Sequence, residues 1–262
     1  MENKSFEEHI QAIAGNDSEK LINSLNKDLI KYIRINKNTI LIDTADRVTD
    51  IERQKSGISS EFFQYCRVID GNSPGKTLDN LAGQFYIQEI SSQLAIDMLT
   101  NNYDVNGKAV CDIAAAPGGK TTQLAEINTD GYICANEVIK SRADILVENI
   151  IKQKIFNVIV TNCEPEWLVK QTGSIFDILV CDLPCSGEGL IAKKKNSIDN
   201  WSYKNVEFCA LRQKSILDQC SNMLKNNGIL LYSTCTFAKE EDEDIVRYMI
   251  DKGFSSLSVK EN

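Results

Sequence analysis

The stretch KAVCDIAAAPGGKTTQ, Lys108–Gln123, decides the fold. It begins with the apolar run of a buried strand. Small residues and the sequence Pro117-Gly118-Gly119 then form a tight turn, and a helical pattern follows from about residue 120. A strand that passes through such a turn into a helix is the first unit of a parallel α/β sheet.

The same alternation continues almost to the end of the chain. Apolar runs typical of strands occur at 131–135, 156–161, 176–181 and 228–233. Helical patterns follow them at 140–153, 164–171, 204–225 and 239–252. Continuous apolar strands that alternate with helices form a sheet covered on both faces. We therefore predict a doubly wound, Rossmann-like α/β domain.

The first part of the chain has shorter, mixed elements. Ser5 is a suitable cap for an amphipathic helix, with Glu8 three residues later. Runs rich in β-forming residues follow at 30–36 and 62–69.

The loop sequence GNSPG at 71–75 is a candidate linker, and a short strand and a helix from about Ser91 follow it. We predict a small α+β domain over residues 1–75 and the Rossmann-like domain over residues 76–262.

Composition excludes several classes of protein. Hydrophobic residues make up 42 % and charged residues 25 %, which is typical of a globular chain. No apolar run is long enough to span a membrane, and the N-terminus lacks a secretory signal, so we expect a cytoplasmic protein. The net charge of −8 has the wrong sign for binding nucleic acid by bulk electrostatics. Residues 185–225, with seven Lys and Arg against four Asp and Glu, still allow a mildly basic face.

The cysteine and histidine content limits the chemistry further. Nine cysteines without a signal peptide indicate free thiols in a reducing compartment. The chain has no CxxC pair and a single histidine, His9, so we expect neither a metal site nor a histidine triad. Any demanding chemistry must therefore use cysteine or carboxylate side chains.

Ligands of such sheets bind beyond the carboxyl ends of the strands. After the first strand come small residues and a helix N-terminus, which let a ligand approach the backbone amides. These residues are Ala114, Ala115, Ala116, Pro117, Gly118, Gly119 and Lys120. The pattern is neither GxGxxG nor GxxxxGK[ST], which favours a nucleoside without a polyphosphate, although a simple tight turn is the alternative.

The next two strand ends carry acceptor groups. Glu137, about 20 residues after the glycine turn, is placed to accept both ribose hydroxyls of a nucleoside, although a surface glutamate is the alternative. The third strand ends in Thr161–Glu164, whose acceptors suit an adenine amino group.

Two cysteines follow the fourth and fifth strands. Asp182 and Cys185 lie in CDLPCSGEG, 181–189, and Cys235 lies in YSTCTF, 232–237. These strands are normally neighbours, so we expect the three side chains to converge on one cleft. A single cysteine is more often a small buried residue. We keep that interpretation for the cysteines within strands: Cys111, Cys134 and Cys181. Two thiols at loop tips beside a carboxylate indicate a functional site.

Together these motifs resemble the RsmB/RsmF (Nop/Sun) family of RNA cytosine-5 methyltransferases. The segments that carry the resemblance, in this order, are AAAPGGKTT, Asn136-Glu137, DLPCSGEG and YSTCTF. The forms of the last three resemble the RsmF-like branch, which acts on 16S ribosomal RNA. The resemblance runs from about Gly83 to Ile250, and IRIN around Arg34 resembles the family's small N-terminal domain.

The resemblance implies S-adenosylmethionine as cofactor. Residues Ala114–Lys120 would hold its methionine end, Glu137 its ribose and Glu164 its adenine, although the family more often has Asp at this third position. Arg142 and Asp182 complete the implied cofactor-binding residues.

The resemblance also implies the catalytic residues. Cys235 would attack C6 of cytosine, Asp182 would hydrogen-bond or protonate the ring N3, and Cys185 would assist product release. The implied partner is RNA, ribosomal RNA first and transfer RNA second, and we expect a monomer.

Other features have two interpretations. Lys193–Lys195 either contact RNA phosphates or form a solvated run, and Trp201 either stacks on a base or packs in the core. We interpret Glu240–Asp244 as a helix first turn. Gly253–Asn262 leaves room for one short strand, whereas the family's catalytic domains continue further, so the C-terminal end is expected to be shortened.

Two other functions are compatible with part of the pattern. The first is a non-catalytic module that keeps the cofactor fold and binds ribosomal components. The second is a Rossmann-like methyltransferase for a small molecule or a protein nitrogen. Two positioned cysteines would be superfluous in that enzyme, because nitrogen attacks a sulfonium without covalent help.

Overall fold

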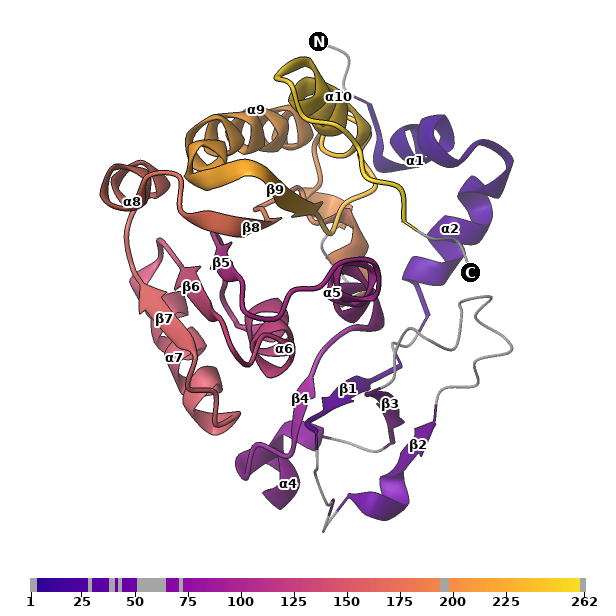
Figure 1. The fold of residues 1–262 in the computed structure, drawn as a ribbon. Helices are drawn as coiled ribbons and strands as arrows, with labels where there is room; N and C mark the ends of the chain where they lie inside the picture. Colours follow the sequence, from indigo (N-terminus) through magenta and orange to yellow (C-terminus); the bar gives the residue numbers. More distant parts are fainter. Residues whose placement is uncertain are drawn as a thin grey trace. The chain divides into compact units, whose positions relative to one another are not determined.

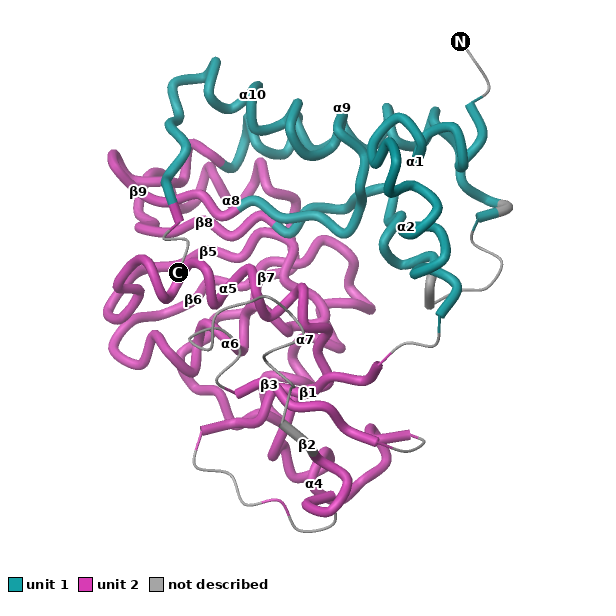
Figure 2. The backbone as a smooth tube through the Cα atoms, turned by 90° about the vertical axis from the view of Figure 1, so that its right-hand side faces the viewer, with its two compact units in different colours: residues 1–29, 182–220, 232–258 teal, residues 30–181, 221–231, 259–262 magenta. Residues whose placement is uncertain are grey.

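A computed structural model describes residues 4–27, 30–37, 41, 44–50, 65–70, 73–193 and 198–259. The chain forms two compact units, coloured separately in Figure 2. Unit 1 comprises residues 1–29, 182–220 and 232–258, and unit 2 comprises 30–181, 221–231 and 259–262. The division at residue 75 stays a prediction.

The main sheet has the strand order β7-β6-β5-β8-β9 (Figure 1). Its strands are β5 (Ala109–Asp112), β6 (Tyr132–Asn136), β7 (Val158–Thr161), β8 (Phe176–Asp182) and β9 (Leu224–Ser233). β5 pairs in parallel with both β6 and β8, and β6 pairs in parallel with β7. The predicted Rossmann-like fold is confirmed, including the neighbouring positions of the fourth and fifth strands.

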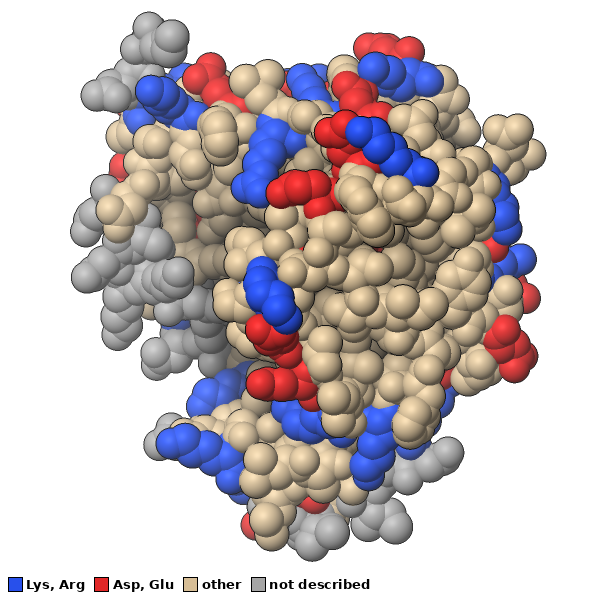
Figure 3. Space-filling view, turned by 90° about the vertical axis from the view of Figure 1, so that its left-hand side faces the viewer, with Lys and Arg blue, Asp and Glu red and all other residues tan. Residues whose placement is uncertain are grey.

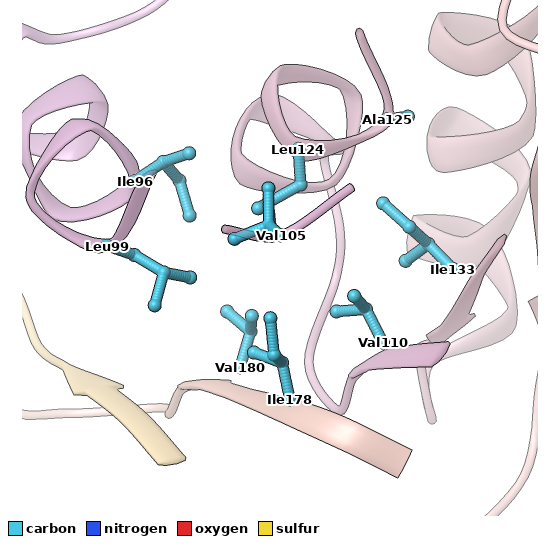
Figure 4. Close-up of a cluster of buried hydrophobic side chains, with 9 residues drawn as sticks. All are labelled: Ile96, Leu99, Val105, Val110, Leu124, Ala125, Ile133, Ile178 and Val180. Carbon is cyan, nitrogen blue, oxygen red and sulfur yellow. The ribbon is translucent and has the colours of Figure 1, made fainter. Parts of the chain in front are cut away.

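The helices of unit 2 are α5 (Ile90–Asn102), α6 (Gly119–Ile127), α7 (Lys140–Lys152), α8 (Pro165–Thr172) and the short α4 (Leu78–Leu81). Of these, α6 contacts β6, α7 contacts β7 and α5 contacts α6, whereas α4 contacts a second sheet. Figure 4 shows Ile96 of α5 and Leu124 of α6 pointing toward Val110 and Ile178 of the strands. Burial of these apolar side chains is the dominant favourable term that holds the first strand–turn–helix unit in place.

A second sheet in unit 2 is antiparallel, with the order β2-β3-β1-β4. Its strands are β1 (Tyr32–Ile35), β2 (Val48–Asp50), β3 (Cys66–Ile69) and β4 (Phe85–Ile87). Ile33, Ile69 and Phe85 form its core. The predicted strand at 30–36 is confirmed. Of the run at 62–69, residues 62–64 lie outside the described residues, as do residues 71–72 of the predicted linker.

Unit 1 consists mainly of helices. They are α1 (Phe6–Ala14), α2 (Ser18–Leu25), α9 (Tyr203–Cys220), α10 (Glu243–Asp251) and the 3₁₀ helices η1 (Gly15–Asp17), η4 (Glu188–Lys193) and η5 (Ile198–Asn200). The predicted capping of α1 is confirmed, because Glu8 N donates to Ser5 Oγ at 3.2 Å and Ser5 N donates to Glu8 Oε2 at 2.8 Å. Phe6 and Ile10 of α1 share a core with Ile191 of η4.

Two predicted helix boundaries are wrong. The helix expected over 204–225 ends at Cys220, and β9 already begins at Leu224, whose carbonyl accepts from Ser174 Oγ at 2.7 Å. The helix expected over 239–252 begins only at Glu243. A turn precedes it, in which the backbone amides of residues 241 and 242 both donate to Ala238 O.

The end of the described chain is irregular, since residues 252–259 form neither helix nor strand. Among the described residues, no helix is long and apolar enough to cross a bilayer. The same residues contain no cluster of three or more His, Cys, Asp or Glu side chains arranged to hold a metal ion.

Candidate active site

The turn after β5 requires glycine. Gly118 has φ +107°, in the left-handed region, and immediately precedes α6. A Cβ atom at Gly118 would lie 3.0 Å from Leu146 Cδ1, and one at Gly119 would lie 3.3 Å from the Gln88 side chain. The absence of Cβ atoms at these two positions therefore lets the turn pack closely against Leu146 of α7 and against Gln88.

Side chains of unit 2 hold this turn by its carbonyl oxygens. Three donor–acceptor pairs lie at 2.7–2.9 Å: Arg142 Nη2 to Ala116 O, Tyr86 OH to Pro117 O, and Arg34 Nη1 to Gly119 O. The N–H of a trans peptide points opposite to its C=O. The amides of Gly118 and Lys120 therefore point away from these donors, as a helix N-terminus that binds a polar ligand requires.

Arg34 joins the small sheet to α6. Its side chain is 2 % exposed and donates to Gln88 Oε1, to Thr122 Oγ1 at 2.8 Å and to Glu126 Oε1 at 3.3 Å. Burial raises the pKa of Glu126, and the Arg34 guanidinium offsets part of that rise. The buried Arg34 therefore pairs with a partly buried carboxylate while it fixes the turn.

Replacing Arg34 with methionine is expected to lower the free energy of unfolding by about 3–5 kcal/mol, because Glu126 loses its buried partner. Urea unfolding of both proteins measures the difference. Arg247→Met is the matched control, since Arg247 pairs with Asp244 on the surface, where an ion pair is worth about 0–1 kcal/mol. Equal losses in the two variants would contradict a stabilising role for Arg34.

Glu137 follows β6 and is 4 % exposed. Its Oε1 accepts from Ile139 N at 3.0 Å. Its Oε2 has no hydrogen-bond partner within the described chain, and the nearest cation is Arg142 Nη1 at 3.5 Å. A buried carboxylate oxygen in this state can accept hydrogen bonds from a ligand hydroxyl. Arg142 bridges Glu137 to the turn, so the structure brings these predicted residues together.

Glu164, predicted at the third strand end, is more exposed than Glu137 at the second. Glu164 has an exposed side chain and caps α8 without a side-chain hydrogen bond. Asn162, two residues earlier, donates from Nδ2 to Glu137 O at 2.6 Å and to Val138 O at 2.9 Å. Lys120 is buried, with Nζ 3.4 Å from Ser92 Oγ.

In unit 1 the two predicted thiols are in contact. Cys185 Sγ lies 2.9 Å from Cys235 Sγ, and Cys235 N donates to Cys185 Sγ at 3.3 Å. All nine cysteines carry reduced thiols. Cys185 is partly buried and Cys235 is exposed. The hydrogen bond with Cys235 and burial both raise the pKa of Cys185 well above the range of an ordinary thiol. Cys185 therefore keeps its proton, which it can donate to Cys235.

Asp182 lies beside the segment that leads to Cys235. It is the last residue of β8, and its Oδ1 accepts from Ser233 Oγ at 2.9 Å. Ser233 ends β9, two residues before Cys235. The carboxylate and the two thiols therefore belong to segments that leave neighbouring strands of the sheet.

Residues 101–260 match the family 16S rRNA methyltransferase RsmB/F. The chain belongs to this family. Its parallel sheet, the helices that flank it and its small antiparallel sheet form the Rossmann-like fold of S-adenosylmethionine-dependent methyltransferases.

Curated relatives agree with this assignment. The ribosomal RNA small subunit methyltransferase F of Vibrio atlanticus is 34 % identical over 260 residues, which cover 94 % of this chain and 53 % of the relative. That of Escherichia coli O157:H7 is 38 % identical over 176 residues, which cover 67 % and 36 %. The chain spans about half the length of the curated relatives it matches.

Two structures from Pyrococcus horikoshii have similar folds. One, a methyltransferase homolog protein, is 27 % identical with a TM-score of 0.74, over 93 % of this chain and 76 % of the other. The other, NSun6 with SFG, is 19 % identical with a TM-score of 0.82, over 98 % and 89 %, and supports the fold alone.

The residues of unit 2 fit the cofactor of an RsmB/F methyltransferase. S-adenosylmethionine combines a polar amino-acid end with a ribose that carries two hydroxyl groups. The turn at 114–120 offers backbone amides and no Cβ atoms at its glycines, and Glu137 offers a buried acceptor oxygen. These are the chemical groups that the two ends of the cofactor need.

Two buried carboxylates of this RsmB/F chain were not predicted as functional from the sequence: Glu188 and Glu241, whose side chains are both 0 % exposed. Glu188 accepts from Trp201 Nε1 at 2.8 Å and from Phe237 N at 3.0 Å, and its Oε1 lies 2.9 Å from His9 Nε2. Glu188 belongs to the motif PCSGEG, so its position was visible in the sequence but its partners were not.

Glu241 corrects the interpretation of the acidic run. Only Glu243 and Asp244 lie in the first turn of α10. Glu241 lies before the helix, and its Oε2 accepts from Ser186 N at 3.0 Å and from Gln213 Nε2 at 2.9 Å. The hydrogen bonds from Ser186 and Gln213, and not the helix dipole, therefore account for a glutamate at position 241.

Trp201 and Lys193–Lys195 each had two interpretations, and the structure bears on that of Trp201. Trp201 is packed, with its ring centroid 5.6 Å from that of Phe6 and 5.0 Å from that of His9. Residues 194–197, with two of the three lysines, lie outside the described residues, as does the side chain of Lys193.

Proposed function

We propose that this chain is an S-adenosylmethionine-dependent RNA (cytosine-5) methyltransferase that acts on ribosomal RNA of the small subunit. The observation that carries the proposal is the 2.9 Å separation of the Cys185 and Cys235 sulfur atoms. Cysteine chemistry suits this substrate, because C5 of cytosine is a poor nucleophile until a thiolate has added to C6. The names of the curated relatives support ribosomal RNA as the substrate class.

The proposed catalytic steps use three side chains. Cys235 Sγ, exposed and able to receive a hydrogen bond from Cys185, forms a bond to C6 of the cytosine. Asp182 hydrogen-bonds or protonates the ring N3, which stabilises the electron-rich ring. The bound cofactor supplies a sulfonium methyl group to C5. Loss of the C5 proton then restores the C5–C6 double bond and expels the Cys235 thiolate, a release that Cys185 assists.

The proposed cofactor residues act mainly by hydrogen bonding. Residues Ala114–Lys120 hold the methionine end, and Glu137 accepts hydrogen bonds from the ribose hydroxyls. Arg142 contacts both Glu137 and Ala116 of the turn and so fixes their relative positions. Glu164 is proposed for the adenine.

Glu137→Gln is expected to raise the Kd for S-adenosylmethionine about 10- to 100-fold. A hydrogen bond to a charged acceptor contributes about 1.5–3 kcal/mol, and 1.4 kcal/mol is tenfold in Kd. Titration calorimetry measures the change. Glu148→Gln, an exposed position on α7, serves as the control. An unchanged Kd in Glu137→Gln would remove Glu137 from the cofactor site.

Charge on the molecule favours local rather than bulk attraction of RNA. On the face shown in Figure 3, Lys and Arg side chains lie beside Asp and Glu in the upper part, several Lys and Arg side chains gather in the lower part, and wide areas carry no charge. With a net charge of −8, the chain is proposed to recognise its target through specific contacts. A cytoplasmic location and a monomeric state stay predictions.

Incubation with methyl-labelled S-adenosylmethionine and small-subunit ribosomal RNA tests the function. Digestion of the RNA to nucleosides is expected to give labelled 5-methylcytidine. Label in another nucleoside would contradict cytosine-5 specificity. If the chain binds RNA but transfers no methyl group to ribosomal RNA or to transfer RNA, the result would favour the non-catalytic module.

A further inference from the structure

The segment that follows Cys185 and the segment that follows Cys235 each contain a buried carboxylate that accepts a hydrogen bond from the other segment. Glu188, three residues after Cys185, accepts from the amide of Phe237 on the other segment. Glu241, six residues after Cys235, accepts from the amide of Ser186 on the first. We call Glu188 and Glu241 the carboxylate clamp. Each carboxylate receives an N–H within two residues of the opposite cysteine, so the clamp fixes the two segments relative to each other.

Direct bonds between the segments support the clamp. Gly189 N donates to Cys235 O at 2.9 Å, and the hydroxyl oxygens of Ser186 and Thr236 lie 2.7 Å apart. A Cβ atom on Gly189 would lie 3.0 Å from Cys235 O, so the close approach depends on glycine. The Cys185–Cys235 contact is therefore one of a series of contacts along these segments.

Other side chains of unit 1 also contact each carboxylate. His9 of α1 and Trp201 face Oε1 of Glu188, while Gln213 of α9 donates to Oε2 of Glu241. Burial raises the pKa of Glu188. The His9 side chain, whose Nε2 lies 2.9 Å from Oε1, and the hydrogen bonds from Trp201 and Phe237 lower this pKa by more than burial raises it, so the net shift is downward. Glu188 is therefore a charged acceptor with donors on both oxygens.

We propose that Glu188 and Glu241 are positioning residues that set the separation of the Cys185 and Cys235 sulfur atoms. Neither carboxylate touches the reacting atoms. Each acts through a backbone amide one or two residues from a cysteine. The inference rests on the proposed function only where it concerns the rate of methyl transfer. The positioning itself is a property of the chain without substrate.

Glutamine substitutions distinguish the two carboxylates. Glu188 has donors at both oxygens, so in Glu188→Gln the amide NH₂ must face a donor on one side. At Glu241, Oε2 alone makes the two shorter bonds, at 3.0 and 2.9 Å, so Glu241→Gln can keep both. Glu241→Ala removes them. Glu243→Gln, on the exposed side of α10, is the matched control.

The test measures how fast diamide closes a Cys185–Cys235 disulfide. Each thiol gives up one hydrogen, and diamide takes up both as it is reduced to the hydrazine. Peptide mapping by mass spectrometry identifies the bond among the nine cysteines. Pre-aligned groups react faster by their effective molarity, and a misplacement of about 1 Å costs about 100-fold. We expect closure to slow about 10- to 100-fold in Glu188→Gln and Glu241→Ala, and less than about threefold in Glu241→Gln and Glu243→Gln.

Methyl transfer on the same proteins gives the second measurement. The two disruptive variants are expected to lower kcat by a similar factor and to leave the Kd for S-adenosylmethionine unchanged, which also verifies that they fold. Equal closure rates in all four variants would overturn the clamp. Slow closure in a chain whose wild type transfers no methyl group would retain the clamp and reject the proposed function. Should Glu188→Gln fail to fold, the comparison of Glu241→Ala with Glu241→Gln decides.

Discussion

Cys235→Ala is expected to lower methyl transfer to RNA by about 10⁴-fold or more, the scale on which a covalent nucleophile contributes to catalysis. Without the thiolate, C6 of the cytosine has no partner and C5 stays too weak a nucleophile. Cys235 is exposed and its sulfur lies 2.9 Å from Cys185, which keeps its own proton. Transfer of labelled methyl groups in single-turnover conditions measures the loss.

Cys66→Ala is the matched control for this experiment. Cys66 is buried in β3, outside the proposed cofactor and catalytic residues, and burial raises the pKa of its thiol to about 12. Its removal is expected to leave transfer unchanged, and both variants are expected to bind S-adenosylmethionine as the wild type does. Full activity in Cys235→Ala would reject the covalent mechanism while leaving the family assignment intact.

Cys185→Ala is expected to trap the enzyme on its RNA. The bond from Cys235 Sγ to C6 still forms, but the Cys185 thiol that assists cleavage of this bond is absent. A protein–RNA adduct that survives denaturing electrophoresis should therefore accumulate and carry the labelled methyl group. Its amount at a fixed time, compared with wild type, is the measurement.

The double variant Cys185→Ala/Cys235→Ala identifies the sulfur in the adduct. It is expected to form none, because Cys235 supplies the bond. An adduct in the double variant would show that another of the nine cysteines reacts. Rapid turnover of Cys185→Ala without accumulation would contradict the role of Cys185 in release.

Much of the fold could be predicted because its signals are local. The apolar run before AAAPGGKTT predicted β5, and Gly118 and Gly119 predicted the turn that follows. The contact of Cys185 with Cys235 was predictable from strand order, since β8 and β9 are neighbours. These inferences need only periodicity and the rules of parallel sheets.

The missed features depend on contacts between distant segments. Nothing in the acidic run around Glu241 indicates that one carboxylate is buried against Ser186, 55 residues earlier in the sequence. The contact of His9 with Glu188 likewise joins opposite parts of the sequence. Burial of a charge depends on the donors that tertiary packing brings to it, and a single sequence does not display those donors.

The contact between His9 and Glu188 has a practical consequence for anyone who trims this protein to a minimal catalytic fragment. A version that starts at residue 76 keeps every motif of the family match but lacks α1. Its Glu188 side chain would lose His9, and the core shared by Phe6, Ile10 and Ile191 would be opened to water. Helix α1 therefore packs against the segment that follows Cys185, and truncation studies should retain it.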